Sequence, residues 1–195
     1  MATLKMGSTT VLTESGGALT INASNPTVTL GSNTTFPAGH VINVSEYNIG
    51  AGSQSSSMFP SDDTIPQRSE GAEIFSQAYS PSTGSCDLRL QAVAHIMEGS
   101  NAAGTMALGL FISDQDNAII TTSQMQVAPY YAGWQDSGTH TIDVLFASWG
   151  TSSKTFSLRS SGANLYNSHM YNSSTSSSHW GSVNTTKFFI TEIAT

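Results

Sequence analysis

The chain has 195 residues and carries 13 acidic against 6 basic side chains, which gives a formal net charge of −7. Charged residues make up only 10% of it, whereas globular domains average about 25%. Ser and Thr together supply about 28%. A few scattered basic residues on an acidic chain bind a phosphate backbone poorly, so the composition excludes a nucleic-acid partner. The sequence has no run of about 20 apolar residues, so we expect no membrane-spanning helix.

The cysteine content and the first residues indicate where the chain is made. Cys86 is the only cysteine, which rules out an intramolecular disulfide and a cysteine-based zinc site. Residues 1–10 lack the apolar stretch and the small-residue cleavage site of a secretory signal. We therefore expect synthesis in a cytoplasm, with any extracellular role reached by another route, such as assembly into a particle.

Residues 1–47 contain short apolar stretches separated by turn residues. The stretches 11–12, 19–21, 28–30 and 41–44 alternate with groups of Ser, Gly, Asn and Pro. Strands this short cannot form a core of their own, because an isolated pair of strands is marginal in water. The sequence predicts an extended β arm over residues 1–47 that pairs with the next domain or with another chain.

Residues 48–71 show no hydrophobic period and are dense in Ser, Gly and Pro. Such a composition is typical of a linker, and a structureless loop of this length inside a compact domain would be unusual. We therefore predict a linker and domain boundary at 48–71. The carboxylates of Asp62 and Asp63 need no explanation there beyond hydration.

Residues 72–195 alternate apolar and polar side chains in short segments that end in Gly, Ser or Asn. This pattern predicts strands at 73–80, 86–99, 105–114, 117–127, 141–149, 154–160 and 187–195. No segment has the 3.6-residue period of a helix. The predicted fold is all-β, with a jelly-roll-like β-sandwich head over residues 72–195. The residues expected to face its core are Leu88, Leu90, Ala92, Ala94, Ile96, Met106, Leu108, Leu110, Ile112, Ile142, Val144, Phe146, Phe156 and Leu158.

The candidates for metal binding and catalysis are weak. The histidines have no ligand spacing; His169 and His179 are the best candidates for a site shared on a threefold axis, although solvated loop histidines explain them better. Asp114, Asp116 and Asn117 resemble the opening of a calcium loop but lack its glycine and closing glutamate, which favours a hairpin turn. No nucleophile elbow, P-loop or zinc-protease motif is present. We predict no cofactor, no metal and no enzyme activity.

Aromatic residues on the predicted loops 128–138 and 164–182 are the candidates for binding. Exposed rings on the loops of a β-sandwich stack on sugars or form a subunit interface, while packing over the open end of the sandwich explains them equally well. These interface candidates are Tyr130, Tyr131, Trp134, Tyr171 and Trp180.

Several phrases resemble small virion structural proteins of tailed bacteriophages, particularly marine ones. TTVLTESGGALTI (9–21) and TTFPAGHVI (34–42) resemble their N-terminal segment, and ALGLFISDQDNAI (107–119) and KFFITEIAT (187–195) resemble the β-rich module of phage fibre proteins. The resemblance covers nearly the whole chain, and none of its phrases is catalytic.

The resemblance implies a protein located in the virion, with a homotrimeric jelly-roll head on an arm that docks to other virion proteins. A fibre- or spike-type appendage in host attachment is the first interpretation, with a host surface glycan as a partner. A capsid decoration protein is the second, and a lectin-like or carbohydrate-active β-sandwich is the third.

Overall fold

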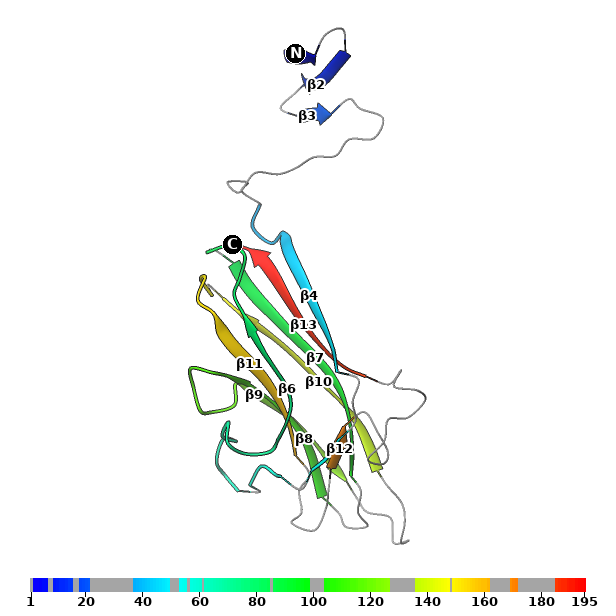
Figure 1. The fold of residues 1–195 in the computed structure, drawn as a ribbon, viewed down its shortest axis with the longest axis vertical. Coiled ribbons are helices and arrows are strands. Elements are labelled where there is room, and N and C mark those ends of the chain that lie inside the picture. The colour runs from blue at the N-terminus through cyan, green and yellow to red at the C-terminus, as the bar shows by residue number, and fades with distance from the viewer. Residues whose placement is uncertain are drawn as a thin grey trace. The chain divides into compact units, whose positions relative to one another are not determined.

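The computed structural model describes residues 2–6, 9–15, 18–21, 37–49, 53–55, 57–60, 62–84, 86–98, 104–126, 136–147, 149–161, 169–171 and 185–195. The chain divides into two compact units, Met1–Thr35 and Phe36–Thr195. We call them the arm unit and the head unit. All described elements in both are strands (Figure 1).

The arm unit is a small antiparallel sheet. Its strands β1 (Ala2–Met6), β2 (Thr9–Ser15) and β3 (Ala18–Ile21) pair in the order β1-β2-β3. The register places Leu4 opposite Leu12, and Leu12 opposite Ile21. Domains below about 40 residues rarely bury enough surface to be stable alone, and this unit spans only residues 1–35.

The head unit contains two antiparallel sheets. The first is built on β4 (Val41–Ile49), β13 (Thr186–Ala194), β7 (Cys86–Glu98) and β10 (Asp136–Phe146), with the short β12 (His169–Tyr171) and β5 (Ser53–Ser55) continuing from the end of β7. The second has the order β6 (Ala72–Tyr79), β11 (Lys154–Ser161), β8 (Gly104–Ile112) and β9 (Ile120–Gln126).

The strand pairs of the head are nested in the chain. The outermost pair is β4 with β13, followed inward by β6 with β11, β7 with β10, and β8 with β9. Apart from the short β5–β12 pair, which also belongs to the first sheet, successive pairs alternate between the two sheets, and β13–β7 and β11–β8 complete them. A long hairpin that wraps into two sheets in this way is a jelly roll. The predicted fold class, an all-β jelly-roll sandwich, is confirmed.

The core between the sheets follows the predicted alternation. The predicted inward residues of β7, β8 and β11 are buried, as is Ile142 of β10; Val144 and Phe146 pack against the same core but are partly exposed. Phe188 and Ile190 of β13 are also fully buried. Each strand therefore contributes every second side chain, as the pleat requires.

The structure corrects the predicted domain boundaries. The arm was expected to extend to residue 47, but β4 pairs with β13 along Val41–Ile49 (cyan and red in Figure 1) and belongs to the head. The boundary lies between Thr35 and Phe36 instead. The predicted linker 48–71 is also part of the head, because β5 joins the first sheet and Phe59 is buried. The strands that pair with β4 and β5 are β13 and β12, which lie more than 100 residues later in the chain. The local sequence pattern of β4 and β5 therefore does not reveal these pairings.

Candidate binding site

The outer face of the second sheet carries a depression over small residues. On β8, the outward positions Ala107 and Gly109 have little or no side chain, and Phe111 is buried beside them. A Cβ at Gly109 would lie 2.8 Å from the Phe111 ring and 3.1 Å from the Phe59 ring. Glycine at this position therefore lets Phe59 pack onto the sheet, with its ring centroid 6.1 Å from that of Phe111.

Phe59 belongs to a segment that covers part of this face. We call residues 57–60 and 62–71 the cover segment. The Phe59 amide donates to Ser161 Oγ at 2.7 Å, and the Gly71 amide donates to the Met58 carbonyl at 3.1 Å. Gly71 has a φ of 66°, and a Cβ there would lie 2.5 Å from the Phe59 ring, so only glycine fits.

Residues 66–68 of the cover segment are fixed to the turn between β8 and β9. Gln67 Nε2 donates to Asn117 Oδ1 at 2.7 Å, and the Ala118 amide donates to the Pro66 carbonyl at 2.8 Å. The Arg68 amide donates to the Asp116 carbonyl at 2.7 Å. Both ends of the segment are therefore held, and the walls that it forms are preorganised.

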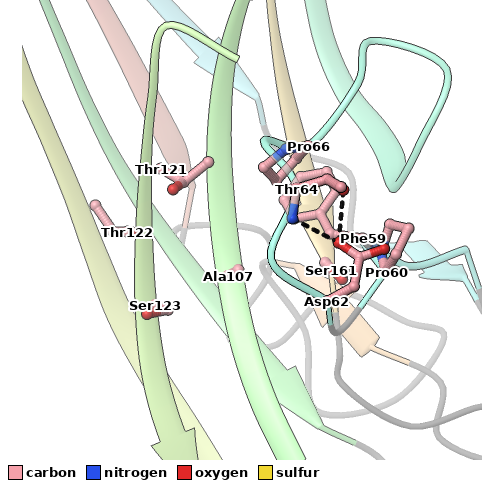
Figure 2. Close-up of a pocket in the computed structure, with 10 residues that line it drawn as sticks. All are labelled: Phe59, Pro60, Asp62, Thr64, Pro66, Ala107, Thr121, Thr122, Ser123 and Ser161. Atoms are coloured by element: carbon pink, nitrogen blue, oxygen red, sulfur yellow. Dashed lines mark hydrogen bonds between the residues drawn. The ribbon is translucent and has the colours of Figure 1, made fainter. Parts of the chain in front are cut away.

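Between the cover segment and the sheet lies a pocket of about 220 Å³ (Figure 2). From the cover segment it is lined by Phe59, Pro60, Asp62, Thr64 and Pro66. From the sheet it is lined by Ala107, Thr121, Thr122, Ser123 and Ser161. Figure 2 shows the Asp62 and Thr64 side chains across the space from β9, with Ala107 of β8 between them.

Hydroxyl groups and one carboxylate supply the polar side chains of the pocket. Asp62 Oδ1 accepts from the Thr64 amide at 2.8 Å and from the Thr64 hydroxyl at 2.5 Å. These two hydrogen bonds lower the pKa of Asp62 below its ordinary value, so the carboxylate is ionised at neutral pH. Among the described residues that line the pocket, Asp62 is the one charged side chain, and it is an anion.

A second polar cluster lies inside the sandwich, around Glu192 of β13. Glu192 is 1% exposed. Its Oε1 accepts from the Tyr79 hydroxyl at 2.6 Å and from the Ser82 amide at 2.9 Å, and the Ser82 hydroxyl donates to Oε2. Asn43 Nδ2 donates to the Tyr79 hydroxyl at 3.1 Å. Because the carboxylate is buried and supplied with donors, we interpret this cluster as structural, tying β4 and β6 to β13.

The Tyr79–Glu192 hydrogen bond predicts a loss of stability at high pH. Burial first, and then the bond to Glu192, raise the pKa of Tyr79 to about 12. The folded state keeps this proton more tightly than the unfolded state, whose tyrosine titrates near 10. The stabilisation is therefore complete below pH 10 and is lost as the pH rises toward 12, by up to about 3 kcal/mol in total.

The free energy of unfolding of the wild type and of Tyr79→Phe, measured by denaturant titration from pH 9 to 12, tests this. The difference between the two proteins should shrink as the pH rises. A difference that is constant across this range would contradict the assignment.

The other candidate residues are placed as follows. Tyr130, Tyr131, Trp134, Trp180 and His179 lie outside the described residues, so their predicted roles stay predictions. Tyr171 and His169 lie in β12, where Tyr171 pairs with Ile96 and Ser53. These strand pairings do not test the predicted interface role of Tyr171 or the predicted metal-binding role of His169.

The acidic turn at 114–117 connects β8 and β9, as the hairpin interpretation predicted. Asp114 pairs with Lys154 Nζ at 2.6 Å, and Asp116 lies 3.7 Å from Arg68. These carboxylates face cations of the chain. Among the described residues, no group of three or more His, Cys, Asp or Glu side chains is arranged to hold a metal ion.

His140 of β10 is a buried polar residue in the core. Its Nδ1 lies 3.0 Å from the Thr122 hydroxyl of β9, which therefore bonds to the interior and is not offered to the pocket. Burial first, and then the nearby His95, lower the pKa of His140.

All described elements of the protein are strands. The described residues therefore contain no helix that is long and apolar enough to cross a membrane.

Sequence analysis missed the pocket. The sequence predicts a hydrated linker at Asp62 and an ordinary strand at Thr121 and Ser123, with no sign that they share a site. The available signal was the pair of small residues Ala107 and Gly109 on the outward face of an otherwise large-residue strand.

The fold defines the protein as a jelly-roll β-sandwich, the architecture of many viral capsid and lectin domains. Comparison with protein families and with curated proteins gives no match.

Several solved structures align with the chain. A structure of the infectious bursal disease virus Gx strain aligns with a TM-score of 0.34 and 11% identity, over 88% of this chain and 42% of that chain. The VP2 subviral particle of infectious bursal disease virus aligns with a TM-score of 0.33 and 11% identity, over 88% and 42%. Dimeric latent PorU from Porphyromonas gingivalis aligns with a TM-score of 0.35 and 9% identity, over 81% and 14%. The chain spans less than half of each of these chains, and TM-scores at this level carry no argument about function.

Proposed function

We propose that this protein is a non-enzymatic structural component of a tailed-bacteriophage virion, a fibre- or spike-type appendage involved in host attachment. The observation that carries the proposal is the division into two unequal units. The head has its own jelly-roll core, whereas the arm unit of residues 1–35 is too small to be stable without a partner. The phrases at 9–21 and 34–42, which resemble phage virion proteins, support it as well.

The arm unit is the part suited to docking. Within its described residues, β1 and β3 each pair on one side only, with β2. An unpaired strand edge offers backbone donors and acceptors to a neighbouring chain, and strand addition satisfies them with little demand on sequence. The arm therefore binds other virion proteins or sister chains, and a homotrimer is the assembly that we propose.

A capsid decoration protein is the second candidate, and the outer face of the first sheet favours it. Val44, Val93 and Leu145 lie on that face, and they are 56%, 39% and 56% exposed. In the register, Thr191 and Arg89 lie between Val44 and Leu145, and Val93 lies beside Lys187. This face therefore offers mixed apolar and polar side chains to another protein, such as a capsid shell. The pocket between the cover segment and β9, on the second sheet, favours the appendage proposal instead, because it could bind a ligand on the host surface.

Copy number separates the two candidates. Quantitative mass spectrometry of purified virions gives the ratio of this protein to the major capsid protein. An appendage is present in tens of copies per particle and a decoration protein in hundreds. A ratio in the hundreds would overturn the appendage proposal in favour of decoration, and absence of the protein from purified virions would overturn both.

Deleting residues 2–35 should separate folding from incorporation. Because the head core lies entirely after residue 35, we expect its thermal midpoint to change by no more than about 2 °C. We expect the shortened protein to be lost from virions assembled in an infected host that expresses it. A deletion of residues 2–49 is the contrast, because it also removes β4 and should unfold the head. Incorporation of the 2–35 deletion at full occupancy would assign docking to the head.

A further inference from the structure

We infer that the pocket between the cover segment and β9 binds one neutral sugar unit, with the Asp62 carboxylate accepting hydrogen bonds from sugar hydroxyls. This inference deepens the attachment role proposed above, on which it rests, by naming the class of ligand. It is carried by the size, the polar groups and the charge of the pocket (Figure 2).

The size of the pocket sets an upper limit on the ligand. Its volume of about 220 Å³ is below the range of sites for drug-sized molecules, which starts near 300 Å³. One pyranose ring is of the right size, whereas a longer glycan would extend out of the open side. The walls are built before any ligand arrives, because Phe59 and Pro66 are held through their backbones. Little ordering cost then opposes the binding of a small molecule.

The polar groups of the pocket match hydroxyl ligands. The hydroxyls of Thr121 and Ser123 each donate and accept, as sugar hydroxyls do, while the Thr64 hydroxyl donates to Asp62 and keeps its oxygen lone pairs for a ligand. Asp62 Oδ1 already accepts twice from Thr64, which fixes the carboxylate, and Oδ2 has no hydrogen-bond partner among the described residues. Hydrogen bonds to an ionised group are about twice as strong as neutral ones. A carboxylate therefore gives an open, exposed site the strength to hold a diol.

The apolar part of the lining suits the carbon-bound face of a sugar. Pro60, Pro66 and Ala107 present small saturated surfaces. The Phe59 ring is 7% exposed because it packs on β8, so it offers no open face for stacking a cation or a base. Because the described lining residues include one carboxylate and no basic side chain, the pocket disfavours anions such as phosphates and uronic or sialic acids.

The test is a titration of the full-length protein with each probe, in which the NMR chemical shifts of the backbone amides of residues 62–65 and 121–123 report binding. The probes are the methyl glycosides of glucose, galactose, mannose, fucose and N-acetylglucosamine, with methyl glucuronide and methyl galacturonide as their anionic matches. We expect saturable shifts with at least one neutral glycoside. We expect its uronide match, where one exists in the panel, to bind several-fold more weakly.

Variants connect the binding to the pocket. Asp62→Asn keeps the acceptor for Thr64 and removes the charge, and it should weaken binding about tenfold. The matched control is Asp63→Asn, which alters the neighbouring exposed carboxylate that does not line the pocket, and it should leave affinity within about twofold. Ala107→Leu fills the floor and should abolish binding. Thr121→Val is a milder change on β9 that keeps the strand geometry and should weaken binding.

The inference is overturned if no glycoside of the panel gives saturable shifts in these amides. It is also overturned if Asp62→Asn and Thr121→Val, both folded, bind as the wild type does. These outcomes leave the virion proposal standing, because incorporation is measured separately on particles. A protein that binds sugar but is missing from purified virions would instead overturn the virion proposal and support the lectin-like alternative.

Discussion

Replacing Glu192 with alanine should lower the free energy of unfolding of the head by about 3–5 kcal/mol. The carboxylate is buried between the sheets and accepts from Tyr79 and Ser82. Its removal leaves the Tyr79 hydroxyl and the Ser82 amide without an acceptor and opens a cavity. Each unsatisfied buried donor costs about 1–3 kcal/mol. Denaturant titration of the wild type and the variant, at pH 7, measures the loss.

Two variants make this test specific. Glu192→Gln keeps the size of the side chain and one carbonyl acceptor, so it should cost clearly less than alanine. Glu46→Ala removes an exposed carboxylate on β4 that pairs with Lys187 at 2.8 Å, and it should change stability very little, because exposed ion pairs contribute little. Equal losses for Glu192→Ala and Glu46→Ala would mean that the buried cluster does not stabilise the sandwich.

Replacing Phe59 with alanine should cost about 3 kcal/mol and should open the cover segment. Phe59 is 7% exposed and packs with Ala107 and Phe111 in a second core on the outside of the sheet. Truncation removes most of that core, and Gly71, which is glycine to make room for the ring, then faces a void. Denaturant titration gives the stability, and hydrogen exchange of the Gly71 and Ala118 amides reports whether the segment opens.

Ile65 provides the matched control for Phe59. It is a large apolar residue of the same segment but is 54% exposed, so Ile65→Ala should change stability by less than about 1 kcal/mol. If Phe59→Ala is as mild as Ile65→Ala, the cover segment is not held by its aromatic anchor. The pocket walls would then not be preorganised, and the sugar site would lose its main physical support.

The jelly-roll sandwich and its inner faces could be predicted from the sequence because both depend on a local pattern. In a strand, every second side chain points to the same side, so the alternation at Leu88, Leu90 and Ala92 already assigns a core face. The turn at 114–117 could be predicted for the same reason, since Asp and Asn bond to their own backbone there.

The domain boundary and the pocket could not be predicted, because they depend on partners distant in the chain. Val41–Ile49 has the same pattern as an arm strand, and only its pairing with β13 assigns it to the head. Phe59 sits in a sequence typical of a linker, and only the small residues of β8 give it a place to pack.

By itself, the sequence determined that the chain is all-β, acidic and rich in hydroxyl groups, and it determined which side of each head strand is buried. Only the tertiary structure decided that Asp62 lies across a pocket from Thr121 and Ser123. The physical reason is that side-chain alternation is set by the backbone geometry of each strand. The position of a site depends instead on which strands and segments, distant in the chain, pack together. The contacts that determine this packing are long-range and are spread over the whole sandwich.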